Sequence, residues 1–117
     1  MPTAKRRGLL LVMIEVDPAH EEEFHRWYNE EHLPERLACP GFLNGRRFIA
    51  VEGEPKYLAL YDLEDTAVLQ SEAYQKIYPP SEWTKKVSKH FLRVVRNVYE
   101  EITPEGADRP PARPAQR

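Results

Sequence analysis

The pattern of apolar and polar residues along the chain predicts four strands. Residues 8–16 (GLLLVMIEV) form a continuous apolar run, which is typical of a strand covered on both faces. Three further stretches are also strand-like: 42–51 (FLNGRRFIAV), 56–63 (KYLALYDL) and 90–102 (HFLRVVRNVYEEI). The segment EGEP joins residues 42–51 to residues 56–63, and this spacing predicts a β-hairpin.

Capping residues and helical spacing predict a first helix after the first strand. Asp17 is a suitable N-cap, and Pro18 suits the first helical turn. A stripe at helical spacing follows, formed by Phe24, Trp27, Tyr28 and Glu31. Pro34 cannot continue the hydrogen-bond pattern of a helix, so we expect the helix to end there.

A second helical stretch lies between the third and fourth strands. Either Asp65 or Thr66 is its predicted N-cap, and it is expected to reach Tyr78, where two prolines stop it. Ser81 then caps a short helix that runs through Val87.

The resulting order, β-α-β-β-α-β, predicts an α+β fold of the ferredoxin-like type. Such a protomer has a four-stranded antiparallel sheet with helices on one face. Because the first strand is apolar on both faces, the other face needs cover, and a second sheet from a second chain is the simplest one. We therefore expect a face-to-face homodimer, built from one domain at residues 8–103. A basic start at residues 1–7 and a proline-rich tail at residues 104–117 are expected to be disordered.

Composition and charge exclude several classes of function. A net charge of −2, with acids and bases interleaved, provides no field for a nucleic acid or an anionic membrane. The first residues lack the apolar length and cleavage site of a signal peptide, and no stretch approaches the ~20 apolar residues of a membrane span. We therefore expect a cytoplasmic protein. Cys39 is the single cysteine, so neither an internal disulfide nor a multi-cysteine metal site can form.

Metal and cofactor motifs are not evident in the sequence. His25 and His32 are seven residues apart, which is about 10 Å along a helix and too far to share one metal. There is no glycine-rich phosphate loop and no nucleophile elbow. We therefore expect no metal and no cofactor.

The segment RWYNEEHLPE, residues 26–35, is the strongest candidate for a functional site. His32 follows Tyr28 by one turn on the same helical face, near the predicted helix end, where the dipole favours imidazolium. His32 is therefore either a general acid or base that titrates near neutrality, or a cap for the last carbonyl groups. Glu31 is a candidate to orient His32 or to meet an arginine. The aromatic residues of this helix fit a buried stripe and the wall of a pocket equally well.

Polar side chains on two strand faces indicate a wet or ligand-filled cavity. Tyr57 and Tyr61 share one face of the third strand. One face of the last strand is predicted to carry Phe91, Arg93, Val95, Asn97 and Tyr99. Buried hydroxyl and guanidinium groups need hydrogen-bond partners, which such a cavity would supply.

Two adjacent arginines in the second strand offer one further contact. Arg46 and Arg47 must point to opposite faces, so one should be exposed and the other inward. We expect a bulge at Asn44-Gly45, which is the one feature that would turn both outward. Arg47 is taken as the candidate binding residue, with the choice between the two left open.

Three segments resemble the dimeric α/β-barrel superfamily, and within it the EthD-like branch: WYNEEHLPERLACPGF, the following Arg46-Arg47-Phe48, and KYLALYDL. The resemblance covers nearly all of residues 8–102. It implies a ferredoxin-like protomer, a homodimer through its sheet faces, and a pocket between helices and sheet with His32 beside it. The superfamily hosts quinol monooxygenases, lactone isomerases, polyketide cyclases, haem-handling enzymes and proteins of no known activity. The fold therefore does not choose the reaction.

The leading hypothesis is a protein that binds a small aromatic or lactone-like molecule. As an enzyme it would use metal-free proton transfer, in isomerisation, cyclisation or elimination. His32 would move the proton, Tyr28 and Tyr61 would hold an oxygen, and other contacts would come from Trp27, Glu31, Arg47, Tyr57, Phe24 and Tyr99. The alternatives are a cofactor-free monooxygenase of quinol-like compounds and a non-catalytic binding or accessory protein.

Overall fold

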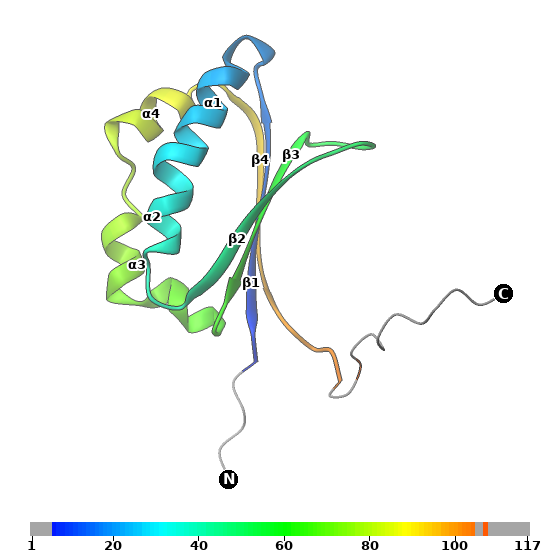
Figure 1. Cartoon of the computed structure of the whole chain (residues 1–117), viewed down its shortest axis with the longest axis vertical. Helices are drawn as coiled ribbons and strands as arrows, with labels where there is room; N and C mark the ends of the chain where they lie inside the picture. Colours follow the sequence, from blue (N-terminus) through cyan, green and yellow to red (C-terminus); the bar gives the residue numbers. More distant parts are fainter. Residues whose placement is uncertain (1–5, 105–106, 108–117) are drawn as a thin grey trace, which may run out of the picture.

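The computed structural model describes residues 6–104 and 107, and its strands form one antiparallel sheet (Figure 1). The strands are β1 (Gly8–Val16), β2 (Phe42–Ile49), β3 (Tyr57–Leu63) and β4 (Phe91–Glu100). Their order in the four-stranded sheet is β2-β3-β1-β4, with every neighbouring pair antiparallel. The predicted ferredoxin-like α+β fold is confirmed. Most of the predicted start and tail lies outside the described residues.

The helices lie together on one face of this sheet (Figure 1). The α-helices are α1 (Glu21–Trp27), α2 (Leu33–Leu37), α3 (Glu72–Ile77) and α4 (Glu82–Ser88). Short 3₁₀ and π segments accompany them: η1 (Pro18–His20), η2 (Tyr28–His32) and η3 (Thr66–Gln70). None of the described helices is both long enough and apolar enough to cross a membrane.

The predicted end of the first helix at Pro34 is wrong. Helical structure continues from α1 through the π turn η2 and α2 to Leu37. In the π turn the N–H of Leu33 donates to the carbonyl of Tyr28, five residues earlier. Proline lacks an N–H and crowds the carbonyl four residues before it, and a wider turn directly ahead of it removes that conflict. His32 therefore lies inside a helix and does not cap its end.

The second helical stretch is divided in two, contrary to the single helix predicted. Asp65 accepts from the N–H of Ala67 and caps η3. Ser71 then has an extended backbone, and its hydroxyl accepts from the N–H of Tyr74, which starts α3. A new cap in the middle of the stretch explains the break. The predicted cap of α4 at Ser81 is confirmed.

The core lies between the helices and one face of the sheet. On β1, Leu10, Ile14 and Val16 are buried on this face. Every second residue of β3 joins them, from Tyr57 to Leu63. The opposite face carries apolar side chains in both strands, namely Leu9, Leu11, Met13, Leu58 and Leu60. The first strand is thus apolar on both faces, as predicted.

One strand face was predicted incorrectly. The register between β1 and β4 shifts between Glu15 and Val16. Because of this shift, Phe91 pairs with Val16 and lies on the helix side of the sheet. Phe91 accordingly packs 5.8 Å from Phe24, ring centroid to centroid. The rest of the predicted set (Arg93, Val95, Asn97 and Tyr99) pairs with odd-numbered residues of β1 and so lies on the opposite face. The polar side chains of β3 and β4 therefore do not line one common cavity.

Candidate functional site

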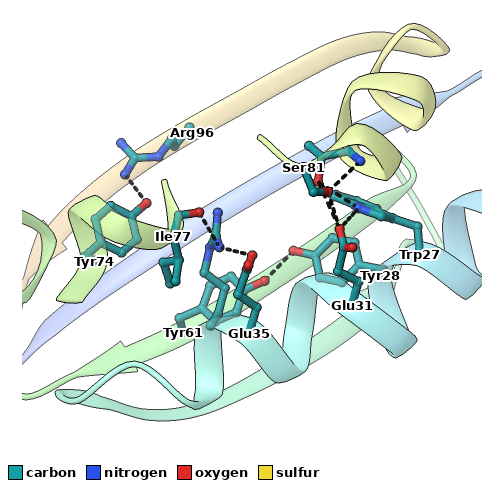
Figure 2. A network of polar contacts seen from close by, with 11 residues as sticks. Trp27, Tyr28, Glu31, Glu35, Tyr61, Tyr74, Ile77, Ser81 and Arg96 are labelled. Atoms are coloured by element: carbon teal, nitrogen blue, oxygen red, sulfur yellow. Dashed lines mark hydrogen bonds and ion pairs between the residues drawn. The ribbon is translucent and has the colours of Figure 1, made fainter. Parts of the chain in front are cut away.

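Tyr28 and Tyr61 form a hydroxyl pair between helix and sheet. Their oxygen atoms are 2.6 Å apart, and both side chains are fully buried (Figure 2). Burial raises the pKa of both phenols, so both stay protonated at neutral pH. One hydroxyl donates to the other, and the accepting hydroxyl keeps its own proton for a further partner. The structure thus brings together two of the three catalytic candidates.

His32 lies against the same aromatic group. Its ring stacks on Trp27 at 4.5 Å between centroids, and the edge of Tyr28 is 4.9 Å away. Burial, together with the positive charges of Arg36 and Arg47, lowers the pKa of His32 to about 3. The ring is therefore neutral at neutral pH. This overturns the expected imidazolium, because no helix end is present there to favour the charge.

Glu31 and Trp27 connect the first helix to α4. The indole nitrogen of Trp27 donates to Thr84 at 3.0 Å and to Glu31 at 3.2 Å. Ser81 donates to the same carboxylate oxygen at 2.6 Å (Figure 2). Glu31 therefore accepts hydrogen bonds from hydroxyl and indole groups. Among the described residues it forms no hydrogen bond or ion pair with His32 or with an arginine. Its position indicates a structural link between the helices.

The arginine pair of β2 divides as expected. A bulge between Phe42 and Asn44 shifts the register, close to the predicted place. Arg46 then pairs with a residue of the uncovered face and is exposed, with its guanidinium 5.4 Å from the ring of Phe48. Arg47 points to the helix side and is half-buried. The bulge lies before both arginines, so they keep opposite orientations.

Arg47 rests on the aromatic residues of the first helix. Its guanidinium carbon lies 4.4 Å from the ring centroid of Tyr28 and 5.3 Å from that of Phe24. Its two terminal nitrogens contact Asn29 Oδ1 at 2.9 Å and His25 Nδ1 at 3.1 Å. Within the described part of the chain no carboxylate pairs with it. Arg47 is thus a half-buried cation held by neutral groups.

The contact with Arg47 determines the tautomer of His25. A guanidinium only donates, so Nδ1 of His25 must accept, and the ring proton is on Nε2. Burial first, and then the charge of Arg47, lower the pKa of His25. His25 is therefore neutral and presents an N–H donor on its outer side.

Tyr57 and its neighbours form the next part of this surface. The hydroxyl of Tyr57 donates to Glu21, which also pairs with Lys56 at 2.9 Å. These two hydrogen bonds lower the pKa of Glu21. The edge of His25 lies 4.8 Å from the ring of Tyr57. The negative charge of Glu21 is thus already balanced beside Arg47.

Two spaces adjoin these residues: a small crevice between the helix and the sheet, and an open groove at the protein surface. Between helix and sheet a crevice of about 10 Å³ remains, bounded by Phe24, Tyr28, Arg47 and Tyr57 among others. That volume accommodates about one water molecule. Outside Arg47, an open groove of about 290 Å³ runs along the edge strand β2, lined by His25, Arg47, Phe48, Ile49 and Tyr57. This β2-edge groove is the candidate binding site, and Arg47 and Tyr57 line both spaces.

Three residues near the site were missed from the sequence. Arg36 is buried, donates to Glu35 at 3.0 Å, and places a positive charge near His32. Its place beside His32 depends on the helix continuing past Pro34, which the sequence does not predict. His25 and Asn29 are the other two, and their spacing of four puts both on one helical face, which is the sequence signal for the pair.

Tyr99 does not join this group. It lies on β4, on the face of the sheet away from the helices, where its hydroxyl accepts from Asn97 at 3.0 Å. Among the described residues no cluster of three or more histidine, cysteine or acidic side chains is arranged to hold a metal ion.

Several solved structures have the same fold at low sequence identity. A "dimeric ferredoxin-like protein" from an uncultured marine organism is 15% identical with a TM-score of 0.64, covering 86% of this chain and 90% of the other. A "Putative antibiotic biosynthesis monooxygenase" from Nitrosomonas europaea is 12% identical with a TM-score of 0.62, covering 91% and 100%. A Bacteroides thetaiotaomicron protein of unknown function, "Possible Oxidoreductase", is 12% identical with a TM-score of 0.62, covering 84% and 100%.

These similarities show that the chain shares the ferredoxin-like fold of those proteins. No curated protein sequence matches the chain. One family model does match, over residues 8–101, and it is described as a domain of unknown function, DUF4286. Because the match spans nearly the whole described domain, the chain belongs to the DUF4286 family.

Proposed function

We propose that this protein binds a small planar molecule by an anionic oxygen that contacts Arg47 in the β2-edge groove. The observation that carries the proposal is the bonding of this guanidinium. Arginine has five N–H donors, and within the described residues Arg47 uses one for Asn29 and one for His25. The other donors can bond a carboxylate or phenolate, and no protein carboxylate there competes for them.

The walls of the groove support a flat ligand. Phe48 and Ile49 are large apolar residues that are 41% and 58% exposed, and both line the groove. Tyr57 adds an aromatic ring to the lining. A planar ring would cover these surfaces while its oxygen reaches the guanidinium.

Proton-transfer chemistry is the proposed activity at this site. Arg47 would stabilise an enolate or phenolate that forms on an aromatic or lactone-like substrate during isomerisation, cyclisation or elimination. His25 contacts that guanidinium through Nδ1 and keeps its proton on Nε2, so we assign it a hydrogen bond from Nε2 to the forming oxyanion, while water in the open groove takes up and returns the substrate proton. Tyr28 would act as a positioning residue, because its ring contacts the guanidinium of Arg47. Two further residues would support Tyr28 in turn, namely Tyr61 and His32.

Oxygenation of an electron-rich phenol is a second candidate. The description of the Nitrosomonas europaea protein favours it, as does the ability of Arg47 to stabilise a phenolate. In that reaction O₂ oxidises the phenolate, one oxygen atom enters the ring, and the other leaves as water with two substrate hydrogens. The substrate supplies the electrons.

The uncovered sheet face supports a homodimer of this chain. Leu9, Leu11 and Met13 of β1 lie beside Leu58 and Leu60 of β3 there. A dimeric relative of the same fold agrees with this arrangement. Placement in the EthD-like branch is supported by the segment WYNEEHLPERLACPGF.

Calorimetric titration tests the binding site. The probes are 4-hydroxybenzoate and its uncharged counterpart 4-hydroxybenzamide. We expect the acid to bind at least about tenfold more tightly than the amide, and Arg47→Gln to remove that difference. Arg46→Gln is the matched control, since it removes the same charge from the opposite face of the strand and should keep the preference. Equal binding of both probes, or an unaltered preference in Arg47→Gln, contradicts the proposal.

Two assays with the same protein separate the activities. Exchange of substrate C–H for deuterium in D₂O, followed by NMR on a lactone, indicates proton transfer. Oxygen consumption with a quinol indicates oxygenation. Tight binding of 4-hydroxybenzoate without either reaction indicates the accessory binding role.

A further inference from the structure

A second groove lies at the other edge of the sheet. The helices pack on β1 and β3 and on Phe91 of β4, but they leave the rest of the helix side of β4 open, where Val94 and Val98 are 51% and 42% exposed. Between β4 and the segment formed by η3 and α3 is an open groove of about 590 Å³. This β4-edge groove and the β2-edge groove lie at opposite ends of the strand order, so neither depends on the other.

The β4-edge groove contains an arginine that no carboxylate neutralises among the described residues. Arg96 donates from Nη2 to the hydroxyl of Tyr74 at 3.4 Å, across from β4 to α3 (Figure 2). Tyr74 is itself fixed, because its ring is buried and stacks on Phe42 at 5.9 Å between centroids. The acid in the groove lining, Glu100, is paired with Arg6. Arg96 is thus an exposed cation that contacts Tyr74 and has donors left for a ligand.

The rest of the lining provides an aromatic surface and amide groups. Tyr78 is 56% exposed, and its ring centroid lies 5.7 Å from that of Tyr74. Gln75 donates its amide nitrogen to the carbonyl of Leu69 at 3.2 Å, which leaves its amide oxygen free to accept from a ligand. Gln70 is exposed and adds a second amide. Such amides suit a ring whose edge carries both donors and acceptors.

We propose that the β4-edge groove is a second binding site, for a small molecule with one anionic group and a flat ring that carries hydrogen-bonding edges. The anion contacts Arg96, the ring lies on Tyr78, and the amides of Gln70 and Gln75 bond its edge. A groove of about 590 Å³ is within the usual size of small-molecule sites. The site does not rest on Arg47 or on the proposed activity.

Adenosine monophosphate and adenosine are the probes, because they share the ring and differ in the anionic group. Binding is followed in the full-length protein by amide chemical shifts in two-dimensional NMR. We expect AMP to shift residues of η3, α3 and β4, and to bind at least about tenfold more tightly than adenosine. Arg96→Gln should remove that preference. Tyr78→Ala should weaken both probes by a similar factor, since it removes the ring surface.

Lys76→Gln is the matched control, because Lys76 is an exposed cation of α3 that does not line the groove. It should leave the preference for AMP unchanged, as should Arg47→Gln at the other edge. The proposal is wrong if about 5 mM AMP shifts none of the lining residues, or if Arg96→Gln binds AMP as well as the wild type. A preference lost equally in Lys76→Gln also contradicts it, because that result indicates a general charge effect.

Discussion

The guanidinium of Arg47 lies 4.4 Å from the ring centroid of Tyr28, and this contact joins β2 to the first helix. The hydroxyl of Tyr28 meets that of Tyr61 on β3, so one ring connects two strands to one helix. The aromatic core and the candidate binding groove therefore share a boundary. A change at Tyr28 should affect both stability and ligand binding.

Removal of the Arg47 cation should destabilise the fold modestly. Arg47→Met loses the cation–π contacts and two hydrogen bonds, and we expect about 1–2 kcal/mol less unfolding free energy. Arg46→Met should cost less than about 0.5 kcal/mol, because its contact with Phe48 is at the surface. Urea denaturation of both variants measures the difference. Equal losses of unfolding free energy would show that the contacts of Arg47 stabilise the fold no more than those of the exposed Arg46.

Removal of either hydroxyl of the tyrosine pair should leave the other without its partner. Tyr28→Phe and Tyr61→Phe should each cost about 1–3 kcal/mol, the penalty for a buried unpaired hydroxyl. The double variant should cost clearly less than the sum of the two, since no orphan group then remains. A double-mutant cycle by chemical denaturation measures this coupling. Strict additivity would mean that the two hydroxyls do not bond in solution.

The half-buried, neutral imidazole of His32 should make the fold sensitive to acid. Its pKa is about 3 in the folded protein, below the ordinary value of 6.5 that holds in the unfolded chain. Between these values the unfolded chain binds more protons, so stability falls as the pH decreases from about 6.5 toward 3. The contribution of His32 to the slope is at most about 1.4 kcal/mol per pH unit.

His32→Asn should flatten this slope. Denaturation of wild type and variant at several pH values between about 4 and 7 gives the comparison. If both proteins lose stability with the same slope, the pKa of His32 is not lowered in the folded protein.

The uncovered sheet face should hold two chains together at micromolar concentration, because a standard interface buries about 800 Å² per partner. Sedimentation equilibrium should therefore give twice the 13.7 kDa mass of the chain. Leu11→Glu puts a charge at the centre of that face, opposite Leu60, and should produce monomers. Leu37→Glu alters an exposed leucine of the helix layer and is the control. A monomeric wild type would refute the face-to-face arrangement.

Local sequence determined the strands and their order. The run GLLLVMIEV became β1 with the predicted bounds, because a strand apolar on both faces requires only a short run of consecutive apolar residues. The cap at Ser81 was equally local, since it depends on one hydroxyl and an N–H three residues later. Arg46 and Arg47 diverge because neighbouring strand residues always point to opposite faces.

Only the tertiary structure decided the environment of the site. Pro34 stops most helices, but here a π turn carries the chain past it, and packing of the flanking aromatic residues holds that turn. Phe91 changed face because of one register shift, which no pattern within β4 reveals. The low pKa of His32 arises from burial and from the charges of Arg36 and Arg47, the latter on β2. Periodicity reports which face a side chain occupies, whereas electrostatic environment depends on distances between segments far apart in the chain.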